Sequence, residues 1–541
     1  MIMNKSLRVL AAGATLSLLS AGVLSHSFAA AGERQQSGGE LKRRLTEDVT
    51  TLNPVRASSL NDRYVADYLY TPLIELDRDL RPIAGLATKW TISSDGTAYQ
   101  FTLNGKATFS DGTAVSASDV VFTLQKAVEK SSQAPQMAAS FEELDVQRTR
   151  ALSKHVVEVV FRHALAGQLL EFNRLFVIPE HIYGKGDLKR FDDVTVGSGP
   201  YVLVRHERGR QLLLRRRETY WREKPYIETV RFKVIALDST AWEAIKLGQI
   251  DETFVSSDTW MRHQTDPAIE TSIRFQRFYT LNYNFVAWNN RHAILRDGNI
   301  RRALAMCIPV ESIIENLYHG TARRLTGPFL PGSYAYNTNV RETPFQPGVA
   351  KQLLASLGWA DHDNDGVLDR NGTPLAFTMT IQATNEFDRL FAQLVQGELK
   401  HIGVDMKIRP LDDATFFTAV TKGDYEAAAL ATSTGLEPHP FTFFHSSQIP
   451  GTGMNFTYYQ NAEADRLIID GRRELDPNKR RDLYWRLHAI LAQDEPFTWT
   501  VQVSEKWALR TRVLGAETSS GYGLFRWYPG ELGWWIPKMY Q

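Results

Sequence analysis

The sequence has a single cysteine, Cys307, among its 541 residues. One thiol permits no disulfide within the chain and no zinc or iron–sulfur centre built from several cysteines. Cys307 lies in an apolar stretch, 303–308, which predicts a small core residue and not a reactive thiol. A dominant charge is also lacking, because 62 Lys and Arg balance 61 Asp and Glu to a formal net charge of +1. This balance excludes a general electrostatic attraction to nucleic acid or to an anionic membrane.

The signatures of the common enzyme classes are missing as well. The sequence contains no Gly-x-Ser-x-Gly elbow, no His-Glu-x-x-His pair and no glycine-rich phosphate loop. Carboxylate pairs such as Glu142-Glu143 and Asp412-Asp413 are adjacent, so their side chains diverge on a helix or a strand. These absences are modest evidence against catalytic activity, and no cofactor is expected. Glycosidase chemistry uses two acidic residues that face each other across a cleft, and the sequence does not exclude such a pair. A secreted hydrolase is therefore the alternative.

The composition, 43% hydrophobic and 23% charged, is that of a globular protein long enough for several lobes. Short strands alternate with amphipathic helices, which favours the α/β class. The basic run 215–217 predicts a solvated strand end. The local patterns predict hairpins over 90–103 and 202–215, a helix over 120–128 behind a capping box of Ser116 and Asp119, a helix capped by Asn299, and a helix and strand over 387–402 and 404–408.

The first thirty residues predict the location of the protein. Lys5 and Arg8 precede an apolar stretch, 9–24, and small residues then suit a signal peptidase site in the segment 27–31. The apolar stretch is short for a membrane anchor and is interrupted by Gly and Ser. We expect a signal peptide over 1–31 that is cleaved. Because this region has no cysteine to carry a lipid, we expect a free periplasmic protein and not a lipoprotein.

Seven segments of the chain resemble, in the same order, those of a known family. The chain is similar to the large extracytoplasmic solute-binding proteins of peptide-type ABC importers, bacterial solute-binding protein family 5, which includes dipeptide-, oligopeptide- and nickel-binding receptors. Most of the matching residues are turns, caps and core positions, so they indicate the scaffold and not the ligand. The segments are 51–54, 109–122, 197–201, 243–251, 300–304, 399–404 and 458–467.

The resemblance implies a two-lobed periplasmic-binding-protein fold of the α/β class, with a hinge and an extra subdomain inserted in the first lobe. It also implies a receptor without enzyme activity that closes on a peptide-like solute, acts as a monomer and delivers its cargo to an inner-membrane ABC permease and its ATPase. The hinge is expected near 284–287 and 496–499. The expected parts are a signal peptide (1–31), the start of the first lobe (40–75), the inserted subdomain (76–195), the continued first lobe (196–284), the second lobe (285–497) and a return to the first lobe (498–541).

A loop over 431–441 is the most informative candidate for ligand contact. In peptide-binding relatives the corresponding loop carries an Asp that pairs with the α-ammonium group of the peptide, because a buried cation needs a counter-charge. Here that position falls on Thr434, and Glu437-Pro438 matches a second acidic element that is a possible substitute. An oligosaccharide, a nickel chelate or haem stays open as the ligand. The predicted ligand-binding residues are Tyr283, Asn284, Trp288, Thr434, Gly435, Glu437, His439 and Asn455.

Two patterns in the sequence bear on metal binding, and neither predicts a metal site. His439 and His445 are six residues apart, which suits neither a helical nor a strand pair of ligands, and no cysteine is near them. The second pattern is the first half of a calcium loop, but its twelfth position is Gly372, where a bidentate Glu is required. A solvated turn is the expected structure for its acidic residues, which are Asp361, Asp363, Asp365 and Asp369.

Overall fold

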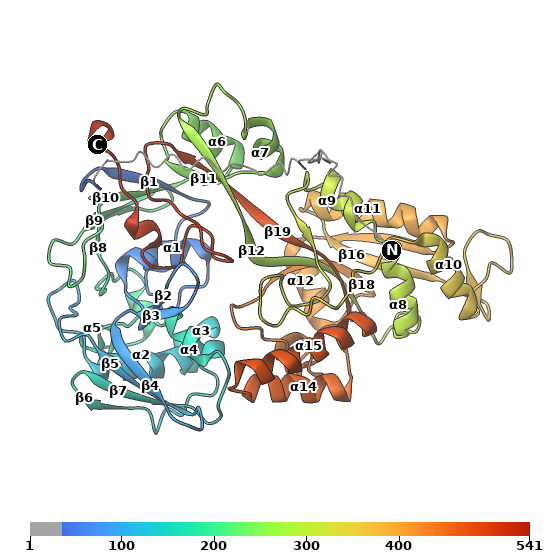
Figure 1. The fold of residues 1–541 in the computed structure, drawn as a ribbon, viewed down its shortest axis with the longest axis horizontal. Coiled ribbons are helices and arrows are strands. Elements are labelled where there is room, and N and C mark those ends of the chain that lie inside the picture. Colours follow the sequence, from blue (N-terminus) through green and yellow to red (C-terminus); the bar gives the residue numbers. More distant parts are fainter. Residues whose placement is uncertain (1–34) are drawn as a thin grey trace, which may run out of the picture. The chain divides into compact units, whose positions relative to one another are not determined.

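The computed structural model describes residues 35–541. The predicted signal peptide therefore lies outside the described residues, and its cleavage stays a prediction. In the part of the chain that the structure describes, no helix combines the length and apolar character needed to cross a membrane. Helices and strands alternate through this part (Figure 1).

Two four-stranded sheets are built mainly from the first half of the chain. In the first, β1 runs parallel to β10, and the other neighbours are antiparallel. All neighbours in the second sheet are antiparallel, and α2 (Ala117–Val128) packs against its β6 and β7. The strands in spatial order are β1 (Glu40–Leu45), β10 (Thr229–Val234), β9 (Gln211–Arg216) and β8 (Tyr201–Glu207), and then β4 (Ala87–Ile92), β5 (Ala98–Leu103), β7 (Val156–Val160) and β6 (Arg150–Ser153).

A mixed seven-stranded sheet joins the middle of the chain to its end. Its β16 is parallel to β17 and β18, whereas β12 and β19 are antiparallel to each other. The helix α11 (Glu386–His401) packs on β16 and β17. The strands are β11 (Glu252–Phe254), β19 (Phe497–Arg510), β12 (Ile273–Trp288), β18 (Ala427–Ser433), β16 (Ala376–Gln382) and β17 (Asp405–Leu411), with β13 (Arg323–Arg324) paired to β19.

The remaining helices connect and cover these sheets. They include short segments that become important at the cleft, namely α3, α4 and α13. The principal helices are α1 (Leu60–Leu69), α3 (Pro135–Ser140), α4 (Gln168–Glu171), α5 (Glu180–Tyr183), α6 (Asp238–Lys246), α7 (Ser257–His263), α8 (Gly298–Ala305), α9 (Val310–Asn316), α10 (Pro347–Ser356), α12 (Asp413–Lys422), α13 (Phe441–Phe444), α14 (Ala462–Arg473) and α15 (Pro477–Asp494).

The long strands β12 and β19 run side by side from one hydrophobic core to others (Figure 1). Phe278 and Leu509 belong to a core formed by residues of the first half and the C-terminal segment. Val286 and Val501, farther along the same strands, belong to a core formed by residues 286–429 and 501. The register shifts between Tyr279 and Tyr283, at the place where the strands pass from one core to the next. The lobe boundaries predicted from the sequence remain a prediction.

Most of the local predictions are confirmed. Both hairpins form, and Ser116 and Asp119 make the capping box of α2. Two details differ. The helix α8 is capped by Asp297, whose carboxylate accepts the amide hydrogen of Asn299, so the cap lies two residues before the expected one. Arg217, expected in a solvated strand end, is buried and donates to the carbonyl oxygens of Phe109 and Gly199.

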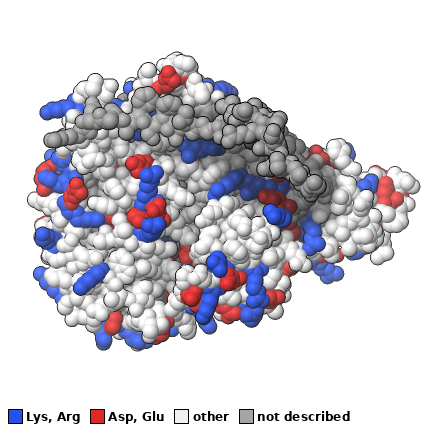
Figure 2. Space-filling view, viewed as in Figure 1, with Lys and Arg blue, Asp and Glu red and all other residues white. Residues whose placement is uncertain are grey.

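The charged side chains are mixed over the surface. On the face shown in Figure 2, Lys and Arg lie beside Asp and Glu where α14 and α15 are exposed. Arg486 pairs with Glu463 at 2.7 Å, and Arg466 pairs with Asp470 at 3.1 Å. Exposed pairs of this kind contribute little to stability, about 0–1 kcal/mol each. They do keep opposite charges interspersed, in agreement with the near-zero net charge.

The turn 197–201 shows why one of the family-like segments has its particular sequence. Gly199 lies against the end of α1, and its amide donates to the carbonyl oxygen of Leu69 at 2.9 Å. A Cβ atom at Gly199 would lie 2.4 Å from the carbonyl carbon of Leu69 and 2.5 Å from the amide nitrogen of Tyr70. These are backbone atoms of a buried segment, so they cannot move aside as a flexible side chain would.

We expect Gly199→Ala to lower the free energy of unfolding by about 1–3 kcal/mol, because the added methyl group overpacks the contact with α1. Gly348→Ala is the matched control, since Gly348 has no atom within 4 Å of its Cβ position and lies in α10. It should leave stability unchanged or raise it by up to about 1 kcal/mol. Urea unfolding of both variants measures the difference, and equal stability of Gly199→Ala and wild type would contradict the close approach.

Candidate ligand-binding cleft

A cavity of about 410 Å³ lies between two groups of residues that are far apart in the sequence. One wall comes from α3, α4 and the residues between and after them, in the part of the chain that carries the first two sheets. The other wall comes from the end of β18, the loop after it and α13. Its volume is within the range of about 300–1,000 Å³ typical of small-molecule sites. Aromatic rings contribute to the second wall, which includes Tyr283, Phe329, Phe441, Phe443, Phe444 and Tyr484.

Arg472, at the end of α14, joins the two walls. Its guanidinium pairs with Glu142 at 2.8 Å, and its carbonyl oxygen accepts the amide hydrogen of Ala166 at 2.8 Å. The same guanidinium lies over the ring of Phe441, 4.1 Å from its centre. Such a cation–π contact holds the arginine in one orientation. A single side chain therefore links α14 to both sides of the cleft.

Gly167, the residue before α4, lets the two walls approach closely. Its φ angle is 78°, in the left-handed region that favours glycine. A Cβ atom there would lie 2.4 Å from Cγ of Glu437 on the opposite wall. The backbone of Gly167 thus packs directly against Glu437, and both the conformation and the space require glycine.

Glu437 is engaged within its own wall. It is 7% exposed, accepts a hydrogen bond from the hydroxyl of Tyr334 and lies 3.4 Å from Nε of Arg480. Burial raises the pKa of its carboxyl group, while the Arg480 charge and the Tyr334 hydrogen bond oppose that rise. Arg480 and Tyr334 thus already compensate the charge of Glu437 within the protein. The sequence had predicted this residue as a possible partner for the ammonium group of a ligand.

Four of the eight predicted ligand-binding residues line the cleft: Tyr283, Thr434, Gly435 and His439. Their role in ligand binding stays a prediction. Desolvation lowers the pKa of His439, and the Glu171 carboxylate, 4.0 Å from its Nε2, only partly offsets this effect.

The other predicted residues do not line the cavity, and strand geometry explains the positions of Asn284 and Trp288. Successive side chains of a strand point to opposite faces of the sheet. Tyr283 faces the core beside the cleft, so Asn284 and Trp288, at odd spacings from it, face the other side. Trp288 is fully buried and donates to Oγ1 of Thr498, and Asn284 donates to the hydroxyl of Tyr318. The prediction that these two residues reach the cleft is corrected accordingly.

Asn455 has a structural position as well. It is fully buried, and its side-chain nitrogen donates to the carbonyl oxygens of His445 and Tyr459. Its side-chain oxygen accepts the amide hydrogen of Tyr459 at 3.1 Å. With all these bonds made to the backbone of its own loop, Asn455 holds the loop and does not reach the cleft.

Sequence reasoning missed four charged residues of the cleft. Glu142, Glu171, Arg174 and Arg472 all line it. Glu171 and Arg174 are three residues apart in a short helical segment, a spacing that normally indicates an exposed ion pair. No local pattern distinguishes them from such a pair, because their importance depends on the opposite wall that covers them.

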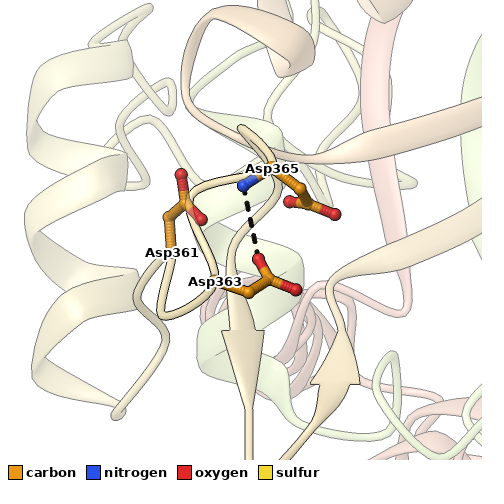
Figure 3. Close-up of side chains that lie close together, drawn as sticks. All are labelled: Asp361, Asp363 and Asp365. Carbon is orange, nitrogen blue, oxygen red and sulfur yellow. Dashed lines mark hydrogen bonds between the residues drawn. The ribbon is translucent and has the colours of Figure 1, made fainter.

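The acidic loop after α10 brings three carboxylates together. Oxygens of Asp361, Asp363 and Asp365 lie within 4.8 Å of one another, and all three residues are exposed (Figure 3). Asp363 accepts the amide hydrogen of Asp365, and Asp361 accepts that of Gly366. Hydrogen bonds of this kind form an ordinary turn of Asp residues. Asp369 is occupied by His362, which lies 3.1 Å away.

We expect calcium to leave the melting temperature of chelator-treated protein unchanged up to millimolar concentrations. The loop lacks the bidentate Glu that completes a calcium site, and a ligand that does not bind the folded state cannot stabilise it. Thermal unfolding with calcium and with magnesium measures the effect. A rise with calcium that is absent in Asp363→Asn would show that the loop binds the ion.

A cleft between two α/β parts that share a pair of long strands is the architecture of a solute-binding receptor. Residues 81–455 match the family described as bacterial extracellular solute-binding proteins, family 5 middle. The chain belongs to this family. The resemblance noted in the sequence is thereby confirmed.

Individual relatives extend the similarity over nearly the whole chain. The oligopeptide-binding protein AppA of Bacillus subtilis is 26% identical over 522 residues, which cover 94% of this chain and 93% of that protein. The nickel-binding periplasmic protein of Escherichia coli is 25% identical over 440 residues, covering 78% and 82%. The structure of B. subtilis AppA with a nonapeptide has a TM-score of 0.75 and 24% identity, covering 93% of this chain and 100% of that one. The two-lobed α/β fold is thus confirmed.

Proposed function

We propose that the protein is the periplasmic receptor of an ABC importer, which captures a peptide-like solute in the cleft and delivers it to a membrane permease. It acts as a monomer and performs no chemistry, and the ATPase of the importer supplies the energy. The observation that carries this proposal is a cleft whose two walls come from separate α/β parts. Family membership supports the receptor role, and the name of the B. subtilis relative supports a peptide as cargo.

The contacts across the cleft suit a receptor that opens and closes. The walls meet through the ion pair of Arg472 with Glu142, the pair of His439 with Glu171, one backbone hydrogen bond and the packing of Gly167 on Glu437. The paired strands β12 and β19 continue on both sides of these contacts. A small rotation about those strands would break only a few polar contacts, and ligand bound between the walls would replace them.

Purified protein tests the ligand class. Native mass spectrometry of protein prepared without denaturation should detect a bound peptide, and a peptide pool should raise the melting temperature as ligand exceeds its dissociation constant. Sugars, a nickel chelate and haem are tested in parallel. Stabilisation by one of these ligands, with none from the peptide pool, would contradict a peptide-like cargo.

A variant that fills the cleft tests its location. Ser433 lines the cavity and is exposed, so Ser433→Trp should abolish ligand-induced stabilisation while leaving the melting temperature of the free protein within a few degrees. Thr418→Trp, at an exposed position of α12, is the control and should retain the response. The measurement is thermal unfolding of each variant with and without the peptide pool. Full ligand response in Ser433→Trp would place the binding site elsewhere.

A further inference from the structure

Two charged side chains in the cleft each have a buried polar atom without a partner. Oε2 of Glu171 and Nε of Arg174 are shielded from solvent, and neither makes a hydrogen bond within residues 35–541. Both residues line the cavity. Leaving a buried charged group unpaired costs more than leaving a neutral one unpaired, about 1–3 kcal/mol or more. Both side chains therefore have hydrogen-bonding capacity that the described residues leave unused beside the cavity.

Glu171 and Arg174 do not neutralise each other. They are three residues apart on α4 and the turn that follows it, a spacing at which oppositely charged side chains often pair. Among the ion pairs of the described residues, however, Glu171 pairs only with His439, at 4.0 Å, and Arg174 has none. The two charges are presented to the cavity separately.

The other charged groups in and beside the cleft have partners within the protein. Arg472 pairs with Glu142 at 2.8 Å. His439 lies 4.0 Å from Glu171, and desolvation lowers the pKa of its imidazole, which weakens this pairing. Just outside the cavity, Glu437 is held by Arg480 and Tyr334. Glu171 and Arg174 are therefore the two charges that remain for a ligand.

Arg63 lies close enough to Arg174 and to Arg526 for their charges to interact. Arg63 and Arg526 line a small neighbouring cavity together with Asp67, and each of these arginines also has a buried Nε without a partner within the described residues. Burial, with the charges of Arg526 and Arg174, lowers the pKa of Arg63 to about 9. Glu75 and Glu531 line the same cavity as Asp67, so three carboxylates balance the three arginines of this region.

We propose that Glu171 and Arg174 bind the two opposite charges of a zwitterionic solute, with the α-ammonium group at Glu171 and the carboxylate at Arg174. The inference rests on the proposed function and assigns the recognition of the ligand termini to α4 and the residues after it. This assignment explains how the chain recognises a free amino terminus although Thr434 occupies the loop position where peptide-binding relatives carry an Asp. The carboxylate of Glu171 supplies that charge from the opposite wall.

The size of the cavity agrees with a short ligand. At about 410 Å³ it lies near the lower end of the range of small-molecule sites. Glu171 and Arg174 form no ion pair with each other, so the two charged groups of the ligand bind at separate points of the same wall. A dipeptide or tripeptide with both termini free meets these requirements.

The test uses one set of dipeptides and tripeptides in four forms: free, N-acetylated, C-amidated and blocked at both ends. Isothermal titration of wild-type protein should show that each blocking group weakens binding by about ten- to a hundredfold, the effect of losing one charge-assisted hydrogen bond. In Glu171→Gln, acetylation should no longer matter while amidation still does. Arg174→Gln should show the reverse.

Glu180→Gln and Arg190→Gln are the matched controls. They make the same charge changes at exposed positions nearby, and they should retain both penalties. Circular dichroism and the melting temperature show that each variant is folded. If wild-type protein binds all four forms equally, or if Glu171→Gln and Arg174→Gln keep both penalties, this inference is overturned and the proposed function stands. If wild-type protein binds none of the four forms, the peptide-receptor function itself is overturned.

Discussion

The pairing of β12 with β19 is the interaction on which the rest of the structure depends. Each strand passes from the core of the first α/β part into the cores of the second, and their backbone hydrogen bonds continue along most of this path. Both strands contribute side chains to the cores of both parts, so the two parts share them. This connection keeps the parts together, and bending at these strands is the motion proposed for closure of the cleft. The register shift between Tyr279 and Tyr283 marks where the ladder is least regular.

The cleft follows from how the two parts meet at a distance from these strands. Gly167 permits one close approach, and Arg472 holds the walls with a few polar contacts. Most charged groups near the cavity are paired within the protein, which lowers the cost of burying them. Glu171 and Arg174 differ because each retains a buried atom without a partner among the described residues. In the proposed binding mode the ligand supplies the missing partners and thereby stabilises the closed arrangement.

Much of the fold could be predicted from local patterns. The capping box of Ser116 and Asp119, the hairpins and the helix over 386–401 depend on residues that are neighbours in the chain, and they form as expected. Errors arose where a distant segment decided the outcome. Arg217 looked solvated in a basic run, but carbonyl groups near residue 109 bury it and accept its hydrogen bonds. Trp288 was predicted to bind the ligand, but it faces away from Tyr283 into a core that distant residues such as Phe377 and Met379 complete.

The sequence alone determined the family, the α/β class and the impossibility of a disulfide within the chain. Turns, caps and core positions are specified by residues close together in the chain, so their order along the sequence is enough to identify the scaffold. Only the tertiary structure decided which charged side chains share the cleft and which are already paired. Whether Glu437 or Glu171 is available to a ligand depends on Arg480, Tyr334 and His439, which become neighbours only when the chain has folded. The free energy of burying a charged side chain depends on its exposure to solvent and on its partners. The neighbouring residues in the sequence determine neither of these.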